Sequence, residues 1–164
     1  MDMTRNIKLS LAYDGGNYHG FQRQNNAVAI QQIIEKCLEK LVGHKIDKLA
    51  ASGRTDTGVH ARGQVINFYT TGTIPIQNIK LALNSLLPDD IVVLSADEMP
   101  PEFSARHSAK SKKYSYYVKQ GDNLDPFQRK YSWYIRKKLN VEAMQNALKY
   151  IEGTHDFSSF RATG

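Results

Sequence analysis

The stretch GRTDTGVHARGQVINFYT, residues 53–70, decides the fold that this sequence predicts. Residues 46–51, just before it, are a short strand candidate, and residues 64–70, at its end, are rich in β-forming side chains, so the glycine-rich part joins two strands. Its glycines allow backbone conformations closed to other residues and let a large ligand approach the main chain. The stretch is therefore typical of a functional loop between two strands of one sheet.

A strand and a helix are predicted before this loop. Residues 7–13 alternate apolar and polar side chains, which is the pattern of a half-buried strand. Apolar residues recur at helical spacing from 30 to 42, with Asn26 as the expected N-cap and Gly43 as the C-terminal stop. Cys37 lies on this apolar stripe, so we expect a buried structural thiol rather than a reactive one.

A second helix and a further strand are predicted after the loop. Thr73 can cap a helix that has Pro75 in its first turn and ends before Pro88, and residues 91–94 form an uninterrupted apolar strand. The order β-α-β-β-α-β is that of ferredoxin-like domains, in which two helices cover one face of an antiparallel sheet. We therefore expect an α+β, ferredoxin-like domain over residues 1–98, with the other face of its sheet open to a ligand.

Residues 105–164 are expected to begin a second ferredoxin-like domain after a linker at residues 99–104. Strand patterns at 112–119 and 131–135 precede a helix that Asn140 can cap. Too few strands remain for this half to close a core by itself. We expect that either the chain is cut here or a partner completes it.

The composition is that of a globular protein with excess positive charge. The chain has 164 residues, 41% of them hydrophobic, and a net charge of +6, which fits one domain or a little more. It contains no apolar run long enough to span a membrane, and its start lacks the apolar stretch of a secretory signal. With a single cysteine it forms no internal disulfide, so we expect a cytoplasmic protein without membrane contact.

Positive charge concentrates between residues 105 and 138, where ten Lys and Arg stand against two acids. Aromatic residues alternate with these cations. Cations for phosphates beside flat rings for unstacked bases are typical of an RNA-contacting surface. A merely solvated charged face is the plain alternative. The residues that we expect to contact RNA are Arg106, Lys110, Lys112 and Lys113.

Asp56 is the candidate catalytic residue of the loop. Arg54 and Arg62 flank it, and nearby positive charge favours the ionised form of a carboxyl group. An ionised carboxylate serves as a nucleophile or a base rather than as a proton donor. The ordinary alternative is a turn former whose carboxylate caps a backbone amide. A hydrolase of glycosidic bonds needs two carboxylates, and we see no second acid near the loop in the sequence.

Two smaller groups of residues have plain interpretations. The histidines match no zinc-site spacing, so we expect them at the surface or in hydrogen bonds and expect no metal. The glycine-rich turn after residue 13 can simply reverse the chain. Tyr18, Phe21 and Gln22 beside that turn are nevertheless candidates for RNA contact.

The motifs resemble those of the tRNA pseudouridine synthase A (TruA) family. GRTDTGVHA at 53–61 is similar to the catalytic motif of that family, and YDGGNYHGFQRQ at 13–24 is similar to its amino-terminal motif. FSARHSAKSKKYSYYV at 103–118 and GTHDFSSF at 153–160 resemble later landmarks in the same order. Thr57 stands where many members carry Ala. Members of the family continue beyond this point and complete a second, pseudo-symmetric ferredoxin-like domain.

The resemblance implies isomerisation of uridine to pseudouridine at positions 38, 39 and 40 in the anticodon stem-loop of tRNA, by a homodimer without cofactor or metal. It implies that Asp56 is the nucleophile, that Arg54 helps to hold the flipped nucleotide and that Tyr114 stacks on the uracil. The second half of a member supplies a basic partner for the carboxylate, so the 164-residue form is expected to be inactive. The alternative is a non-catalytic RNA-binding module in which Asp56 is structural. For Tyr114 the alternative is a core strand residue, since Tyr116 and Val118 lie on the same face.

Overall fold

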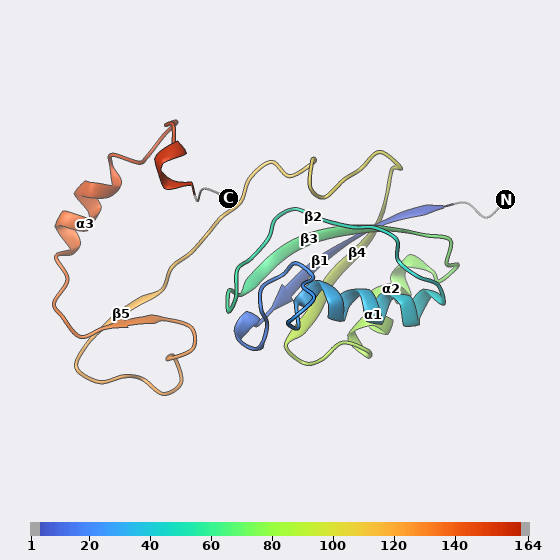
Figure 1. Ribbon diagram of the computed structural model, residues 1–164, viewed down its shortest axis with the longest axis horizontal. Helices are drawn as coiled ribbons and strands as arrows, with labels where there is room; N and C mark the ends of the chain where they lie inside the picture. The colour runs from blue at the N-terminus through green and yellow to red at the C-terminus, as the bar shows by residue number, and fades with distance from the viewer. Residues whose placement is uncertain (1–3, 162–164) are drawn as a thin grey trace. The chain divides into compact units, whose positions relative to one another are not determined.

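The computed structural model describes residues 4–161, and the chain divides into two compact units after Lys112 (Figure 1). The first unit is the predicted β-α-β-β-α-β domain. Its sheet is antiparallel throughout, with the strand order β2-β3-β1-β4. This order is that of a ferredoxin-like sheet, so the predicted α+β fold is confirmed for this unit. Its elements are β1 (Arg5–Tyr13), the 3₁₀ helix η1 (Gly15–Asn17), α1 (Ile30–Val42), β2 (Leu49–Ala51), β3 (Ala61–Thr70), α2 (Ile76–Asn84) and β4 (Ile91–Met99).

The hydrophobic core lies between the sheet and the two helices, which cover the same face of it (Figure 1). Alternate residues of β1 and β3 point to this face, because successive side chains of a strand point to opposite sides. Ile7 lies opposite Phe68 and Leu9 lies opposite Ile66, and all four side chains are fully buried. The helices contribute buried residues at helical spacing. These are Ile30, Ile34 and Leu38 from α1 and Ile79 and Leu83 from α2.

The segment expected as a linker at 99–104 packs instead on the other face of the sheet. Asn67 Nδ2 donates a hydrogen bond to Asn6 Oδ1 (2.8 Å), and Asn6 Nδ2 donates to the carbonyl oxygen of Phe103 (2.9 Å). The backbone N–H of Ala105 donates to Asn67 Oδ1 (2.8 Å), and Ala105 is buried. Because a buried amide must find partners, these two asparagines tie the segment to the sheet. The face predicted to be open is therefore covered at one end.

The helix starts differ from the predicted caps. The N-cap of α1 is Ala29 rather than Asn26, because the loop before it supplies acceptors from its own backbone. The N–H groups of Ile30 and Gln31 donate to the carbonyls of Gly20 (3.2 Å) and Phe21 (2.9 Å). An orphan N–H that meets a backbone carbonyl needs no side-chain cap.

The other helix boundaries follow the sequence more closely. Pro75, not Thr73, is the N-cap of α2. The predicted stop at Gly43 is confirmed, since this residue ends α1 with a φ of 76°. Cys37 is half-buried, and burial raises the pKa of its thiol. Among residues 4–161, no helix combines the length and the apolar character that crossing a bilayer requires.

The second unit has no buried residue in its described part, 113–161. Its strands β5 (Val118–Gln120) and β6 (Trp133–Ile135) are shorter than predicted and pair in parallel. Helix α3 (Val141–Leu148) begins as predicted, with Asn140 Oδ1 accepting from the N–H of Ala143 (2.9 Å), and a 3₁₀ helix, η2 (Ser158–Phe160), follows. A two-stranded sheet without cover is marginally stable in water, so this unit carries apolar side chains without a core of its own.

Candidate functional site

Asp56 occupies the first position of a tight turn in the loop between β2 and β3. The N–H of Val59 donates to the carbonyl oxygen of Asp56 (3.1 Å), which leaves Thr57 and Gly58 at the centre of the turn. Gly58 has a φ of 78° at the third position, where a type II turn requires a residue without a side chain. The glycine predicted for conformational freedom therefore has that role here, and it fixes the backbone of Asp56.

The loop is held from behind by the segment that follows β1. The N–H of Phe21 donates to the carbonyl of Thr55 (2.9 Å), and the N–H of Gly58 donates to the carbonyl of Tyr18 (3.3 Å). The Tyr13 hydroxyl lies 2.9 Å from Thr55 Oγ1. Two motifs that are separated by 28 residues of sequence thus form one structure, in which the first supports the second.

Two glycines of the supporting segment are required by this close approach. A β-carbon on Gly15 would collide with the carbonyl of Val59, and one on Gly20 would lie 2.7 Å from the carbonyl oxygen of Thr55. Gly20 also has a φ of 80°, which other residues rarely adopt. The turn after β1 therefore does more than reverse the chain, because it lets the Asp56 loop lie directly against it.

Tyr18 and Phe21 support the loop from the core, and burial keeps both side chains from the RNA contacts considered for them. Only 7% of Tyr18 and 2% of Phe21 are exposed. The Tyr18 hydroxyl donates to Asp90 Oδ1 (2.5 Å), and burial raises its pKa. The Phe21 ring stacks on Tyr13 with the ring centres 6.3 Å apart. Gln22 alone of the three candidates is exposed.

The carboxylate of Asp56 has no structural partner in the described chain. Within residues 4–161, no ion pair joins it to Arg54 or Arg62, the two cations that flank it in sequence. All three side chains are exposed, so each is solvated by water and does not pair with the others. No hydrogen bond in the same part of the chain joins this carboxylate to a backbone amide either. Its oxygens are therefore available to a ligand.

A second acid lies near the loop, contrary to the expectation from sequence. Asp14 Oδ1 lies 2.9 Å from His60 Nδ1, and the N–H of Gly15 lies 3.1 Å from the same nitrogen. Asp14 Oδ1 also accepts a hydrogen bond from the N–H of Gly16 (2.9 Å). Sequence reasoning missed this acid because 46 residues separate it from His60. The available signal was that Asp14 belongs to the amino-terminal motif and His60 to the loop motif.

One cation of the predicted RNA-contacting set lies at the loop itself. Gly53 leaves room for Lys112, because a β-carbon there would lie 3.2 Å from the lysine Nζ. Among the described residues Lys112 forms no ion pair, and its side chain is exposed. The structure thus places Lys112 beside the start of the loop, next to the end of β2. The same loop carries Arg54 and Asp56.

The other predicted site residues divide between the two units. Arg106 and Lys110 are exposed residues of the first unit. Lys113 and Tyr114 belong to the second unit, where both are exposed, the tyrosine by 61%. Tyr114 is therefore not a core strand residue, and its ring is accessible.

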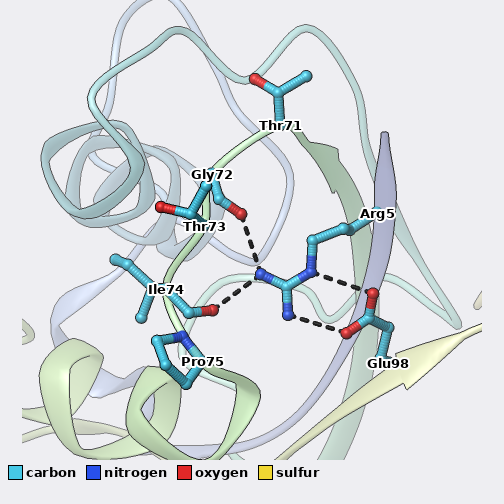
Figure 2. A pocket seen from close by; sticks show the side chains of 7 residues that line it. All are labelled: Arg5, Thr71, Gly72, Thr73, Ile74, Pro75 and Glu98. Atoms are coloured by element: carbon cyan, nitrogen blue, oxygen red, sulfur yellow. Dashed lines mark hydrogen bonds and ion pairs between the residues drawn. The ribbon is translucent and has the colours of Figure 1, made fainter. Parts of the chain in front are cut away.

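A pocket of about 380 Å³ lies at the end of the sheet away from the Asp56 loop (Figure 2). The charged side chains that line it, Arg5 and Glu98, bind each other, and Arg5 also binds the backbone. Arg5, the first residue of β1, donates from Nε and Nη2 to Glu98 (3.0 and 2.8 Å) and from Nη1 to the carbonyls of Gly72 and Ile74 (2.9 and 2.8 Å). The hydrogen bond from Arg5 lowers the pKa of Glu98. The loop meets the other end of β1, at Tyr13, so this pocket is not part of the site.

The described residues offer no ready metal site. Across residues 4–161, no three or more His, Cys, Asp or Glu side chains gather closely enough to hold a metal ion. The loop itself presents the exposed carboxylate of Asp56, with Arg54 near it in sequence and Lys112 beside Gly53.

Comparison with known proteins identifies the family. The sequence profile of the tRNA pseudouridine synthase family matches residues 10–108, which is more than half of the chain and includes the Asp56 loop and its support. The chain is 48% identical to tRNA pseudouridine synthase A of Thermoanaerobacter pseudethanolicus and of Ruminiclostridium cellulolyticum, and 46% identical to that of Acetivibrio thermocellus. Each comparison covers 98% of this chain and 65% of the relative, so the chain spans slightly less than two thirds of their length. The chain belongs to the tRNA pseudouridine synthase family.

Proposed function

We propose that this chain is part of an enzyme that isomerises uridine to pseudouridine at positions 38, 39 and 40 in the anticodon stem-loop of tRNA. The observation that carries the proposal is the state of Asp56. Its carboxylate is exposed, has no partner within residues 4–161 and stands on a turn whose backbone is held from behind. An aspartate that stabilises a turn typically accepts a hydrogen bond from a backbone amide. The carboxylate of Asp56 accepts none from the described residues, so a role in binding or reacting with a ligand explains it better.

The reaction requires a group that can hold C1′ while the base turns. The bond from N1 to C1′ breaks, the uracil rotates, C5 bonds to C1′, and the proton that C5 loses is balanced by one that N1 gains. A carboxylate nucleophile such as Asp56 can form a transient adduct and so divide this change into easier steps. No redox step or phosphate transfer is involved, and the proposal includes neither cofactor nor metal.

The target nucleotide must leave its stem to reach Asp56, which costs a few kcal/mol of lost stacking and pairing. We assign Arg54 to the flipped geometry, since a guanidinium can stack on a base or bridge a phosphate. We assign Tyr114 to the uracil, on which an accessible ring can stack. Phosphate contacts are assigned to Arg106, Lys110, Lys112 and Lys113. Lys112, beside Gly53, has the most direct support of these four.

The proposal extends to the assembly. The second domain, expected from sequence at residues 105–164 and found as a unit after Lys112, is assigned to RNA contact. The active protein is taken to be a cytoplasmic homodimer. The apolar side chains that the second unit exposes, such as Met144 and Leu148 on α3, support a domain completed by further chain or by a partner. A chain of this length alone is then expected to be inactive, because half of the site would be missing.

A product assay separates this proposal from its alternatives. In an active form of the protein, tRNA that carries tritium at C5 of uridine should release tritium to water while the base stays attached. Free uracil would instead indicate hydrolysis, and binding without any product would indicate an RNA-binding module. The experiment is decisive when the Asp56→Asn variant is measured beside the wild type. Pseudouridine formation at the wild-type rate by that variant overturns the assignment of Asp56.

A further inference from the structure

We propose that Asp14 and His60 form a positioning pair that holds the Asp56 loop in its reactive shape, an inference that rests on the proposed function for its catalytic consequence. His60 directly follows Val59, whose N–H closes the turn on Asp56. Its ring nitrogen Nδ1 lies 2.9 Å from Asp14 Oδ1 and 3.1 Å from the backbone nitrogen of Gly15. The pair thus fastens the end of the turn to the segment behind it.

The other hydrogen bonds of the loop lie mainly before the turn, so the end of the turn at Val59 depends on the contacts of His60. Thr55 is held through its carbonyl and hydroxyl, on the side before Asp56. Gly58 is held by one hydrogen bond, from its N–H to the carbonyl of Tyr18 (3.3 Å). After the turn, the next regular pairing is that of Ala61 with Tyr13 in the sheet. Between Gly58 and the sheet, the His60 side chain makes the polar contacts to Asp14 and Gly15 described above.

The geometry suits either protonation state of the ring. A ring nitrogen with a proton donates, and one without a proton accepts. With a proton, Nδ1 can donate to the Asp14 carboxylate; without one, it can accept from the N–H of Gly15. In both cases His60 remains tied to the turn after β1. A residue that only positions the loop can act in either protonation state, whereas a proton-transfer residue has to alternate between the two.

The acid of the pair is itself held in place. Asp14 Oδ1 accepts from the N–H of Gly16, and the N–H of Asp14 donates to the carbonyl of Asp90 (2.9 Å). The carboxylate of Asp90 is engaged by the Tyr18 hydroxyl (2.5 Å) and by Asn17 Nδ2 (3.3 Å). Asp90, just before β4, therefore stabilises the turn after β1, and that turn stabilises the Asp56 loop. Support passes from Asp90 through Asp14 to His60.

The pair is placed to affect the loop more than the fold. About a third of each side chain is exposed, 34% for His60 and 35% for Asp14, and neither belongs to the hydrophobic core. Removing an exposed pair costs little global stability. A loop displaced by an ångström can nevertheless lose about a hundredfold in rate, because catalysis depends on position.

The first test needs no enzymatic activity. In the 164-residue protein, His60→Ala should speed amide hydrogen exchange at Gly58 and Val59 by about tenfold, because loops held by few contacts open locally. Exchange at Leu9 in the core should be unchanged. His60→Asn places an amide at about the reach of Nδ1 and should restore slow exchange, whereas the longer His60→Gln should not. Unchanged exchange at Gly58 and Val59 in His60→Ala overturns the proposal whether or not the protein makes pseudouridine.

The second test measures catalysis in an active form of the protein. His60→Ala should lower kcat by about 10- to 100-fold with KM within about threefold, and His60→Asn should recover most of kcat. The loss in the double variant with Asp14→Ala should be smaller than the product of the two single losses, because the residues act as one unit. Equal rates for the Asn and Gln variants, or full additivity, contradict the pair. If the wild type makes no pseudouridine, the proposed function fails while the exchange test still decides the pair.

Discussion

At the scale of the residue, the informative property of Asp56 is the lack of any structural task for its side chain in residues 4–161. Its backbone is fixed by the turn to Val59, but its carboxylate is exposed and free of ion pairs in that part of the chain. Preorganised backbone with an accessible functional group is the arrangement that catalysis by positioning requires. The structure thereby favours a chemical role over the role of a turn former.

Asp56→Asn tests that role most directly. In an active form, the variant should form no detectable pseudouridine, since an amide cannot form the adduct, while tRNA affinity should stay within a few fold because phosphate contacts dominate binding. Product formation and filter binding measure the two effects. Asp47→Asn, an exposed acid away from the loop, is the matched control and should change neither quantity. A large loss of affinity with retained chemistry contradicts the assignment.

Arg54 is predicted to act through the shape of its guanidinium as well as its charge. Arg54→Ala should lose most turnover and some binding, whereas Arg54→Lys should keep binding but not turnover, because an ammonium neither stacks nor forms a planar fork. Steady-state kinetics and binding on the same tRNA separate the two. Arg62→Ala provides the control for an exposed arginine of the same stretch. Wild-type turnover in Arg54→Ala is the result that excludes a role in base flipping.

At the scale of the element, the turn after β1 and the loop between β2 and β3 form one unit of structure. Their approach requires glycine, as the contact between Gly20 and the carbonyl of Thr55 illustrates. β1 ends and β3 begins at this point, where Tyr13 pairs with Ala61, and the two strands bring the two segments together. The rigidity of the loop therefore derives from the register of the sheet.

Gly20→Ala should be more destabilising than Gly43→Ala. Both glycines have positive φ, 80° and 76°, so each alanine incurs roughly 1–2 kcal/mol of backbone strain. Only at Gly20 does the new β-carbon also meet a backbone oxygen, at 2.7 Å, whereas Gly43 has open space. Urea denaturation should show a free energy of unfolding lower by about 1 kcal/mol or more for the Gly20 variant. Equal free energies of unfolding for the two variants would mean that the loop moves away from the new β-carbon at no cost.

The basic segment before and after the unit boundary is predicted to bind phosphates. Neutralising Lys110, Lys112 and Lys113 together should weaken RNA binding at low salt and reduce the slope of log K against log salt by roughly 0.7–0.9 for each phosphate that is no longer neutralised. Fluorescence titration over a salt series measures the slope. An unchanged slope means that these lysines face solvent. The control neutralises three exposed lysines elsewhere in the chain: Lys36, Lys45 and Lys48.

At the scale of the whole molecule, the two units differ in how they are stabilised. The first has a continuous core, whereas residues 113–161 contain no buried side chain. Apolar residues of α3, such as Val141 and Met144, are exposed by 58% and 47%. Exposed apolar surface of this kind marks a face made for contact with further protein. The relatives, of which the chain spans 65%, are long enough to supply it.

The 164-residue chain by itself is predicted to bind tRNA weakly and to form no pseudouridine, even with Asp56 intact. Much of the rate enhancement comes from positioning, and the proposed function assigns part of that positioning to residues other than these 164. A single-turnover assay with excess protein on unmodified tRNA measures this directly. Hydrogen exchange on the same sample should find slow amides in β1 and fast ones in α3. Robust product formation would show that residues 1–164 contain the whole active site.

The sequence by itself determined the elements of the first unit and the residue type at the site. Alternation in β1 and the apolar stripe of α1 depend on near neighbours, so the order β-α-β-β-α-β and the stop at Gly43 followed from the chain alone. The motif around Asp56 likewise indicated a functional loop before any coordinates. Local pattern was enough because each of these features is repeated or marked within a few residues.

Only the tertiary structure decided which distant residues act together. The pairing of Asp14 with His60, the burial of Tyr18 and Phe21 and the docking of residues 99–105 all depend on the register of β1 against β3 and β4. The absence of an ion pair between Asp56 and either Arg54 or Arg62 in residues 4–161 is likewise visible only in the structure, where all three side chains are exposed. Contacts across a sheet are set by backbone pairing over tens of residues, and no local pattern records them.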